Sequence, residues 1–197
     1  INGSIGEDVG ELEDKHALVR GKDGYLFQTD EFIFPRLTGE VSLSAKNMET
    51  WLTALRFRRS VARDAGGEYL LFIVPERHVV YQGFLPEGVK ISDKRPVNTL
   101  LNSDAFLYLS YPLNDMVLGR AFMEPYPKGG SHWNAWGAYI GYRDICFRCG
   151  LQPKPIDYFE IEHNPVPGGC DLDDRLGEEA RPYTTFSKRT ASGRCIF

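Results

Sequence analysis

Two neighbouring segments carry the hydrophobic patterns that predict regular structure most clearly. In residues 44–65, apolar side chains recur at spacings of three and four, which predicts an amphipathic helix with Ser44 as its N-cap. Two glycines end that helix, and Tyr69–Val74 follows as a continuous apolar run that Pro75 stops. A helix that leads directly into a strand buried on both faces is typical of a parallel sheet, so the pattern indicates an α/β fold.

The rest of the chain alternates between short helices, short strands and loops. Ala105–Leu109 is predicted to be a second buried strand, parallel and adjacent to the first. A tight turn at Gly21–Gly24 precedes another short strand. The remaining expectations are loop or edge structure over Phe32–Thr38, helices over Arg95–Ser103, Leu113–Leu118 and Ala135–Cys149, a strand over Tyr158–Glu162, a loop over Pro165–Leu176 and a strand opening at Arg194–Phe197.

Length and charge exclude several classes of protein. The 197 residues fit one domain, with residues 1–17 as a polar lead-in and 18–197 as the domain itself. Lys and Arg number 23 against 27 Asp and Glu, and no basic run occurs, which argues against nucleic-acid binding. No apolar stretch approaches the ~18 residues of a transmembrane helix. The chain begins with Ile1, so a signal peptide or anchor removed from it would not be seen.

The predicted helix over residues 44–65 carries four arginines, Arg56, Arg58, Arg59 and Arg63, that lie largely off its apolar stripe. The ordinary interpretation is a solvated basic flank on an amphipathic helix. The alternative is a binding patch.

His132 is the strongest candidate for chemistry. It lies in the run Gly-Gly-Ser-His-Trp-Asn at 129–134, at the end of a glycine loop and just before a predicted helix. A neutral imidazole is the natural general base near pH 7, and a loop leaves it open to substrate. The alternative is a histidine that fills or caps the loop. His78 follows a buried strand, where α/β sheets bind ligands, whereas His16 and His163 fit surface positions.

The four cysteines, Cys146, Cys149, Cys170 and Cys195, allow three pairings. Disulfides are favoured over a zinc site or redox catalysis, because one Cys-x-x-Cys inside a predicted helix with scattered histidines is a poor start for a metal site. We therefore predict no metal and no cofactor. The sequence motifs of the common hydrolases and phosphate-binding loops do not occur.

Four blocks of sequence follow one another along the chain. They are GKDGYLF at 21–27, VPER at 74–77 with Tyr81 and the Leu-Pro pair at 85–86, SHWN with a later Gly-Ala at 131–138, and CDL with a later Leu-Gly at 170–177. In order and spacing they resemble the alginate O-acetyltransferase (AlgX/AlgJ-like) family, over residues 18–197. The resemblance implies an SGNH-hydrolase-like fold, with a central, mostly parallel sheet flanked by helices.

The resemblance also implies an O-acetyltransferase, or an acetylesterase, that acts on a cell-surface polysaccharide. In such proteins a serine attacks the acetyl donor, a histidine takes its proton and an aspartate orients the histidine. His132 matches the histidine, but Gly130 stands at the aspartate position and Ser131 at a threonine position. The family's serine lies in a Gly-Asp-Ser block after a strand like Arg194–Phe197, so we expect it beyond Phe197.

These matches define a predicted site. We expect the strand end at Pro75–Arg77, the His132 loop and the Asp171 loop to converge on one cleft, because ligands in α/β sheets bind beyond the carboxyl ends of the strands. Asp171, or a backbone carbonyl, would replace the missing acceptor for the His132 ring. Arg77 would contact an anionic sugar or the donor, with a structural salt bridge as the alternative. The predicted catalytic residues are His132, Ser131 and Asp171, and the predicted substrate contacts are Arg77, Tyr81, Trp133 and Asn134.

Compartment and partners follow from the same resemblance. It implies a periplasmic or cell-surface protein, a polysaccharide substrate and an acetyl donor supplied by a membrane-bound acetyltransferase partner. That compartment, with the even number of cysteines, predicts at least one disulfide, and Cys170–Cys195 is the favoured pair. Because Gly130 removes the usual carboxylate, the alternative is a non-catalytic module of the same fold that binds polysaccharide or acts as a scaffold.

Overall fold

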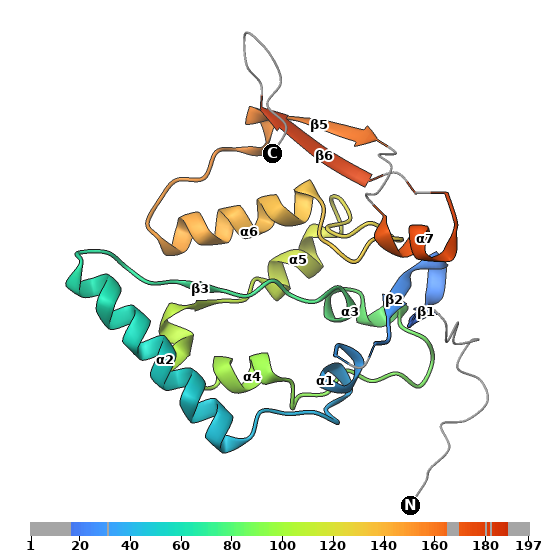
Figure 1. Ribbon diagram of the computed structural model, residues 1–197. Coiled ribbons are helices and arrows are strands. Elements are labelled where there is room, and N and C mark those ends of the chain that lie inside the picture. Colours follow the sequence, from blue (N-terminus) through green and yellow to red (C-terminus); the bar gives the residue numbers. More distant parts are fainter. Residues whose placement is uncertain (1–16, 31, 165–169, 180, 182, 189–197) are drawn as a thin grey trace, which may run out of the picture.

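The computed structural model describes residues 17–30, 32–164, 170–179, 181 and 183–188 (Figure 1). Its strands are β1 Leu18–Arg20, β2 Leu26–Gln28, β3 Leu71–Phe72, β4 Leu109–Ser110, β5 Phe159–Asn164 and β6 Tyr183–Lys188. Its α-helices are α1 Phe34–Thr38, α2 Ala45–Asp64, α3 Arg77–Val80, α4 Pro96–Leu101, α5 Leu113–Gly119, α6 Ala135–Arg148 and α7 Asp171–Leu176. Short 3-10 helices occupy Lys22–Gly24, Gln82–Phe84, Asp104–Tyr108 and Ile156–Tyr158.

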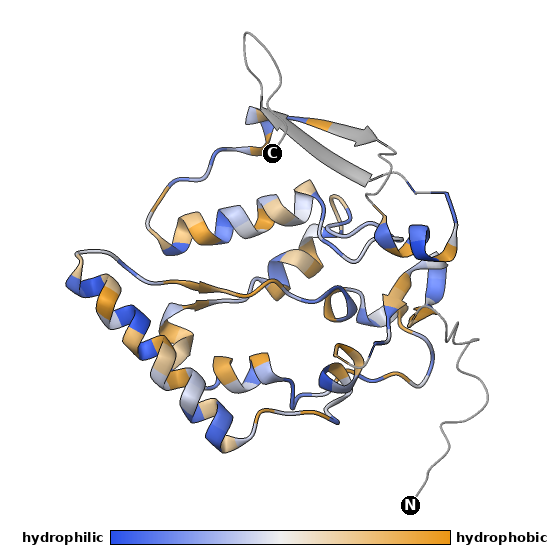
Figure 2. Cartoon of the chain, viewed as in Figure 1, coloured by the Kyte–Doolittle hydropathy of each residue, from blue (hydrophilic) through white to orange (hydrophobic). Residues whose placement is uncertain are grey.

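The β3–β4 pair lies between two helical layers, with α2 and α4 on one side and α5 and α6 on the other (Figure 1). The two strands are parallel neighbours, with Leu71 opposite Leu109, as the sequence predicted. Leu52 and Leu55 of α2 pack into the same apolar cluster as Leu109. Figure 2 shows β3 as an apolar segment and α2 as a helix of interleaved hydrophilic and apolar positions. The predicted packing of α2 against this strand pair is therefore confirmed.

The two strands are much shorter than the apolar runs predicted. Of Tyr69–Val74, only Leu71 and Phe72 pair in β3, and both are half-buried. Most of the second predicted strand, Ala105–Leu109, lies in a 3-10 helix that the Ser103 hydroxyl caps. The reason is that a short apolar run cannot by its pattern distinguish a strand from a buried helical turn. The described residues form three two-stranded sheets, so the central parallel sheet is not confirmed.

Two segments predicted to be loops contain short helices. Phe34–Thr38 forms α1, which has a proline in its first turn and ends at Gly39 with φ 85°. Asp171–Leu176 forms α7, which ends at Gly177 with φ 69°. Each helix has fewer than two turns, too few for an apolar repeat to be visible in the sequence. The predicted strand at Arg194–Phe197 lies outside the described residues.

A second core surrounds Tyr81 and joins the amino-terminal hairpin to the middle of the chain. β1 and β2 are antiparallel, with Val19 opposite Phe27, and the predicted turn connects them. Tyr81 is fully buried between the hairpin and Tyr126. The members of this core are Val19, Tyr25, Phe27, Val80, Tyr81, Leu85, Met116, Tyr126, Trp136, Tyr139 and Ile140.

The carboxyl-terminal strands form a separate antiparallel pair. β5 and β6 pair from Phe159 opposite Lys188 to Asn164 opposite Tyr183. In Figure 1 this pair lies over α6. Among the described residues, no helix is both long enough and apolar enough to cross a membrane.

The predicted disulfide is not supported. Cys146, Cys149 and Cys170 each have a free thiol, and Cys195 lies outside the described residues. The Cys170 thiol is buried, and its Sγ donates to the carbonyl oxygen of Arg181 at 3.2 Å. This thiol therefore helps to hold the segment after α7 in place.

His78 lies in the interior of the protein, under the amino-terminal hairpin. The residue is only 3% exposed, and its Nε2 lies 2.8 Å from the carbonyl oxygen of Gln28. Burial lowers the pKa of His78 to about 4, and the charge of Arg77 lowers it further, whereas the hydrogen bond to Gln28 acts in the opposite direction. A neutral imidazole that donates from Nε2 fits this environment.

This burial predicts a loss of stability in mild acid. The pKa of His78 is about 4 in the folded protein against 6.5 for an ordinary histidine. As the pH falls from about 6.5 to about 4, only the unfolded chain takes up this proton, and the free energy of unfolding should drop by about 3 kcal/mol. Urea unfolding at pH 7 and at pH 4.5 measures the drop. In His78→Gln, whose amide can still donate to Gln28, the drop should be smaller; an equal drop would contradict the prediction.

Candidate functional site

A buried arginine holds the loop that carries His132. Arg77 begins α3 and is only 3% exposed. Its guanidinium donates to the carbonyl oxygens of Pro127, Lys128 and Gly130. Burial lowers the pKa of Arg77 to about 10, so the group remains charged at neutral pH. The loop is therefore folded around a cation, with its carbonyls pointing inward.

The amino-terminal hairpin closes over the same guanidinium. The Arg77 guanidinium carbon lies 5.6 Å from the ring centroid of Tyr25 and 5.4 Å from that of Phe27. The backbone N–H of Leu26 donates to the carbonyl oxygen of Lys128 at 3.0 Å. Aromatic faces attract a guanidinium, so the hairpin and the loop are held together through one charge.

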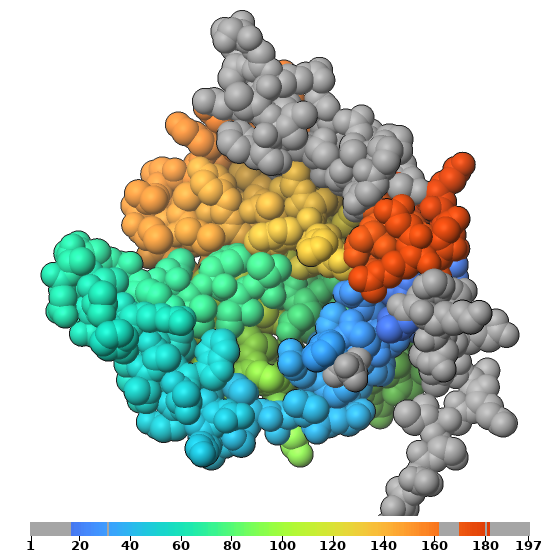
Figure 3. Space-filling view, in the orientation of Figure 1, coloured from blue at the N-terminus to red at the C-terminus, as the bar shows by residue number. Residues whose placement is uncertain are grey.

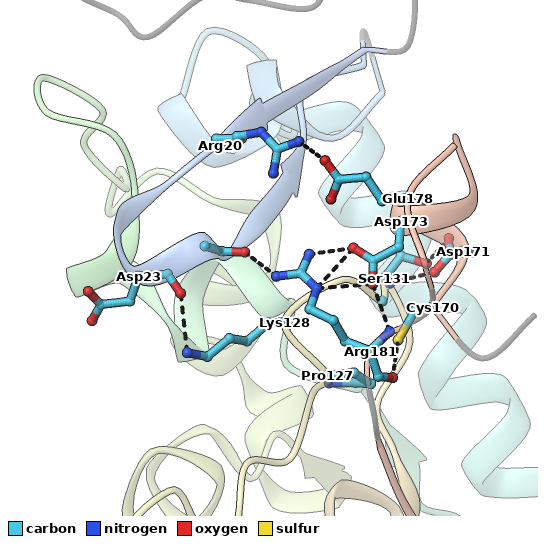
Figure 4. Close-up of polar contacts among 12 residues, drawn as sticks. Arg20, Asp23, Pro127, Lys128, Ser131, Cys170, Asp171, Asp173, Glu178 and Arg181 are labelled. Carbon is cyan, nitrogen blue, oxygen red and sulfur yellow. Dashed lines mark hydrogen bonds and ion pairs between the residues drawn. The ribbon is translucent and has the colours of Figure 1, made fainter. Parts of the chain in front are cut away.

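Helix α7 fixes the loop from another side. The carbonyl oxygen of Gly129 accepts the backbone N–H groups of Leu172 at 2.9 Å and Asp173 at 3.1 Å. The fully buried carboxylate of Asp173 forms an ion pair with Arg181, which also donates to the carbonyl oxygen of Gly24 at 2.6 Å. Figure 4 shows the contact of Asp173 with Arg181, and Figure 3 shows α7 packed beside the hairpin.

Asp171 binds the residue before His132. Its Oδ1 accepts the backbone N–H of Ser131, and its Oδ2 accepts the Ser131 hydroxyl, both at 2.7 Å (Figure 4). The carboxylate therefore holds Ser131 rather than the His132 ring. His132 itself is exposed and makes no hydrogen bond with any residue that the structure describes.

The four predicted substrate contacts lie around this loop. Arg77 and Tyr81 are buried, and the Tyr81 hydroxyl donates to the carbonyl oxygen of Tyr126 at 3.3 Å. Asn134 is the N-cap of α6: its Oδ1 accepts two backbone N–H groups of the first turn, at 3.0 and 3.1 Å. Trp133 is half-buried, and its ring packs 6.0 Å from that of Phe72. All four therefore contact the protein interior, and Trp133 is the least buried of them.

Thus the structure brings together the three segments that the sequence singled out. Arg77 binds the carbonyl oxygen of Gly130, and Asp171 binds the next residue, Ser131. His132 follows at the surface. Sequence reasoning missed Asp173 and Arg181, which close the other side of the loop. Asp173 stands in an acidic stretch that reads as a solvated surface, so its pattern carried no signal of burial.

Comparison with known proteins supports the fold. No protein-family model matches the chain, and neither does any curated protein. Among solved structures, the O-acetyltransferase domain of Pseudomonas putida AlgJ is similar with a TM-score of 0.60 and 19% identity, over 89% of this chain and 66% of that chain. The protein has the fold of that domain. The resemblance found in the sequence is confirmed at this level, and the chain spans 66% of the neighbour's length.

A second solved structure is similar to a smaller extent. It is a DHHW family protein from Eubacterium siraeum, with a TM-score of 0.48 and 17% identity. The match covers 69% of this chain and 47% of that chain.

The carbonyl contacts of Arg77 predict a large effect of a charge-conserving substitution. Arg77→Lys should lower the free energy of unfolding by about 2 kcal/mol or more. The reason is that a lysine ammonium group cannot donate to all three carbonyl oxygens as the planar guanidinium does. Arg58→Lys, at an exposed position of α2, is the matched control and should change it by less than about 0.5 kcal/mol. Urea unfolding measures both, and equal stabilities would show that the carbonyl contacts do not hold the loop.

The contact of Gly129 with α7 predicts that no side chain fits at this position. A Cβ added to Gly129 would lie 1.9 Å from Oδ2 of Asp173. Gly129→Ala should therefore destabilise the protein by about 2 kcal/mol or more, as overpacking of an interior does. At Gly83 an added Cβ would meet no atom within 4 Å, so Gly83→Ala is the control. Thermal unfolding compares the two, and a Gly129→Ala protein as stable as the control would refute the close contact.

Proposed function

We propose that this protein is an O-acetyltransferase, or an acetylesterase of the same type, that acts on a cell-surface polysaccharide. The observation that carries the proposal is an exposed histidine on a loop fixed from three sides, in the fold of an O-acetyltransferase domain. The proposal includes a periplasmic or cell-surface location. It also includes an acetyl donor, which a membrane-bound acetyltransferase partner would supply.

In this proposal His132 is the general base. It takes the proton of a serine hydroxyl as the serine oxygen attacks the acetyl carbonyl, and later returns the proton to the leaving group. The family pattern puts that serine after a strand that Arg194–Phe197 matches, and we assign the nucleophile to that block. His132 is exposed, so it can reach a bound ester, while Arg77 and Asp171 hold the backbone of the two residues before it.

The neighbours of His132 have supporting roles. Trp133 is only half-buried, and an aromatic side chain suits the apolar face of a sugar. Ser131 and Asp171 fix the loop, since both oxygens of the carboxylate are used on one residue. Arg77 and Asn134 act through the loop and α6, as positioning residues rather than as ligands of the sugar.

A non-catalytic polysaccharide-binding or scaffold module is the second candidate. One observation favours it: position 130 is glycine and Asp171 is engaged with Ser131, so no carboxylate among the described residues contacts the His132 ring. In the serine-protease example, loss of the orienting carboxylate lowers the rate by about 10⁴-fold. A histidine in this state should be a weak base.

Hydrolysis of an acetyl ester by the full-length protein tests the proposal. With p-nitrophenyl acetate as substrate, His132→Ala should lower kcat/KM by about 10³-fold or more, with little change in thermal unfolding. Any accessible histidine could hydrolyse this reactive ester without an active site. His16→Ala is the control for that background reaction and should keep the wild-type rate. Equal turnover by the wild type and His132→Ala would overturn the catalytic role. Polysaccharide binding with no turnover by either would establish the binding module instead.

A further inference from the structure

A pocket on α2 has the features of a ligand site and shares no residue with the His132 loop. It has a volume of about 300 Å³, near the lower end for small-molecule sites. One wall is the arginine-rich face of α2, and the other is the 3-10 helix at Asp104–Tyr108. The lining residues are Arg56, Arg59, Ser60, Arg63, Asp64, Asp104 and Tyr108.

Two buried polar atoms in this pocket have no partner among the described residues. They are Nε of Arg59 and the hydroxyl oxygen of Tyr108. Tyr108 is only 4% exposed, and the guanidinium carbon of Arg59 lies 4.9 Å from its ring centroid. Buried polar atoms in native proteins nearly always have hydrogen-bond partners, so these two atoms are available to a further group that enters the pocket.

Both unpartnered atoms can donate a hydrogen bond. An arginine N–H is a donor only. Burial raises the pKa of Tyr108, so its hydroxyl keeps its proton at neutral pH. Hence the group that completes this arrangement must be an acceptor.

The charges of the pocket favour an anionic acceptor. Arg56 is already neutralised by two hydrogen bonds to the Asp104 carboxylate, each 2.9 Å long. Arg59 has no ion pair with a described residue, and Arg63 approaches only the exposed Glu68, at 3.8 Å. Positions 59 and 63 are one helical turn apart and lie on the same face of α2. The three arginines of the lining outnumber its two carboxylates, Asp64 and Asp104, so the pocket keeps a net positive charge.

We propose that this pocket binds one oxyanion group, a carboxylate or a phosphate, of a sugar-sized ligand. Arg59 and Arg63 supply the positive charge, and the Tyr108 hydroxyl donates a further hydrogen bond. Planar guanidinium groups match the oxygens of carboxylate and phosphate, which a hydrated lysine does less well. This binding site does not depend on the acetyl-transfer activity proposed above.

Calorimetric titration of the full-length protein with inorganic phosphate, and separately with glucuronate, tests the proposal at fixed ionic strength. At least one of the two should bind saturably. Tyr108→Phe, which removes only the hydroxyl, and Arg59→Lys, which keeps the charge, should each weaken binding by about tenfold or more. Arg58→Lys changes an exposed arginine of the same helix outside the pocket and should leave affinity unchanged.

The outcomes separate the sources of the oxyanion. Saturable binding of phosphate alone identifies a phosphorylated ligand, and binding of glucuronate identifies an acidic sugar. No saturable binding of either probe would overturn the proposal. So would an equal loss of affinity in Arg58→Lys, because that result would indicate a diffuse charge effect. Thermal unfolding of each variant verifies that the fold is kept.

Discussion

A guanidinium charge buried in the interior needs compensation, since its removal from water costs several kcal/mol. For Arg77 the compensation comes from three backbone carbonyls of one loop and two aromatic faces of the hairpin. To supply those carbonyls, the loop over residues 125–134 must wrap around the cation with its oxygens inward. Of the next two residues, Ser131 is half-buried against Asp171, and His132 is exposed. The exposure of His132 thus follows from a charge beneath the loop.

The second constraint comes from α7 and acts on the same few residues. Asp173 is fully buried with its carboxylate against Gly129, and its charge is balanced by Arg181. The hydrogen bond from Arg181 to Asp173 raises the pKa of Arg181, so this arginine stays charged. Removing one partner of a buried pair typically destabilises a protein by about 3–5 kcal/mol, because it leaves an unpaired charge. Three segments distant in sequence are therefore joined at one loop by two charges.

Sequence reasoning succeeded where a signal is local. The helix over 45–64 repeats its apolar positions for several turns and begins at a serine cap, and Asn134 caps α6 in the same way. The sequence predictions were wrong where contacts with distant residues determine the local structure. The apolar run at 105–108 became helical rather than extended, and α7 is too short to leave a periodic trace. The His132 loop could be singled out by its glycines, but nothing local distinguishes Asp171, which binds Ser131, from a free carboxylate.

For the catalytic role that we propose for His132, the geometry of the loop separates two contributions that usually occur together. Holding the backbone next to His132 restricts where the imidazole can lie, and well-oriented groups can gain several kcal/mol from such positioning. Fixing the tautomer and stabilising the imidazolium need an acceptor on the ring itself, and Asp171 uses its two oxygens on Ser131. The described residues therefore provide the first contribution and not the second. Gly130 likewise supports positioning but not orientation of the ring. Its carbonyl oxygen accepts from Arg77, and it has no carboxylate to offer His132. The fold keeps the His132 loop in position, and the orientation of the imidazole depends on whichever group its ring nitrogens meet.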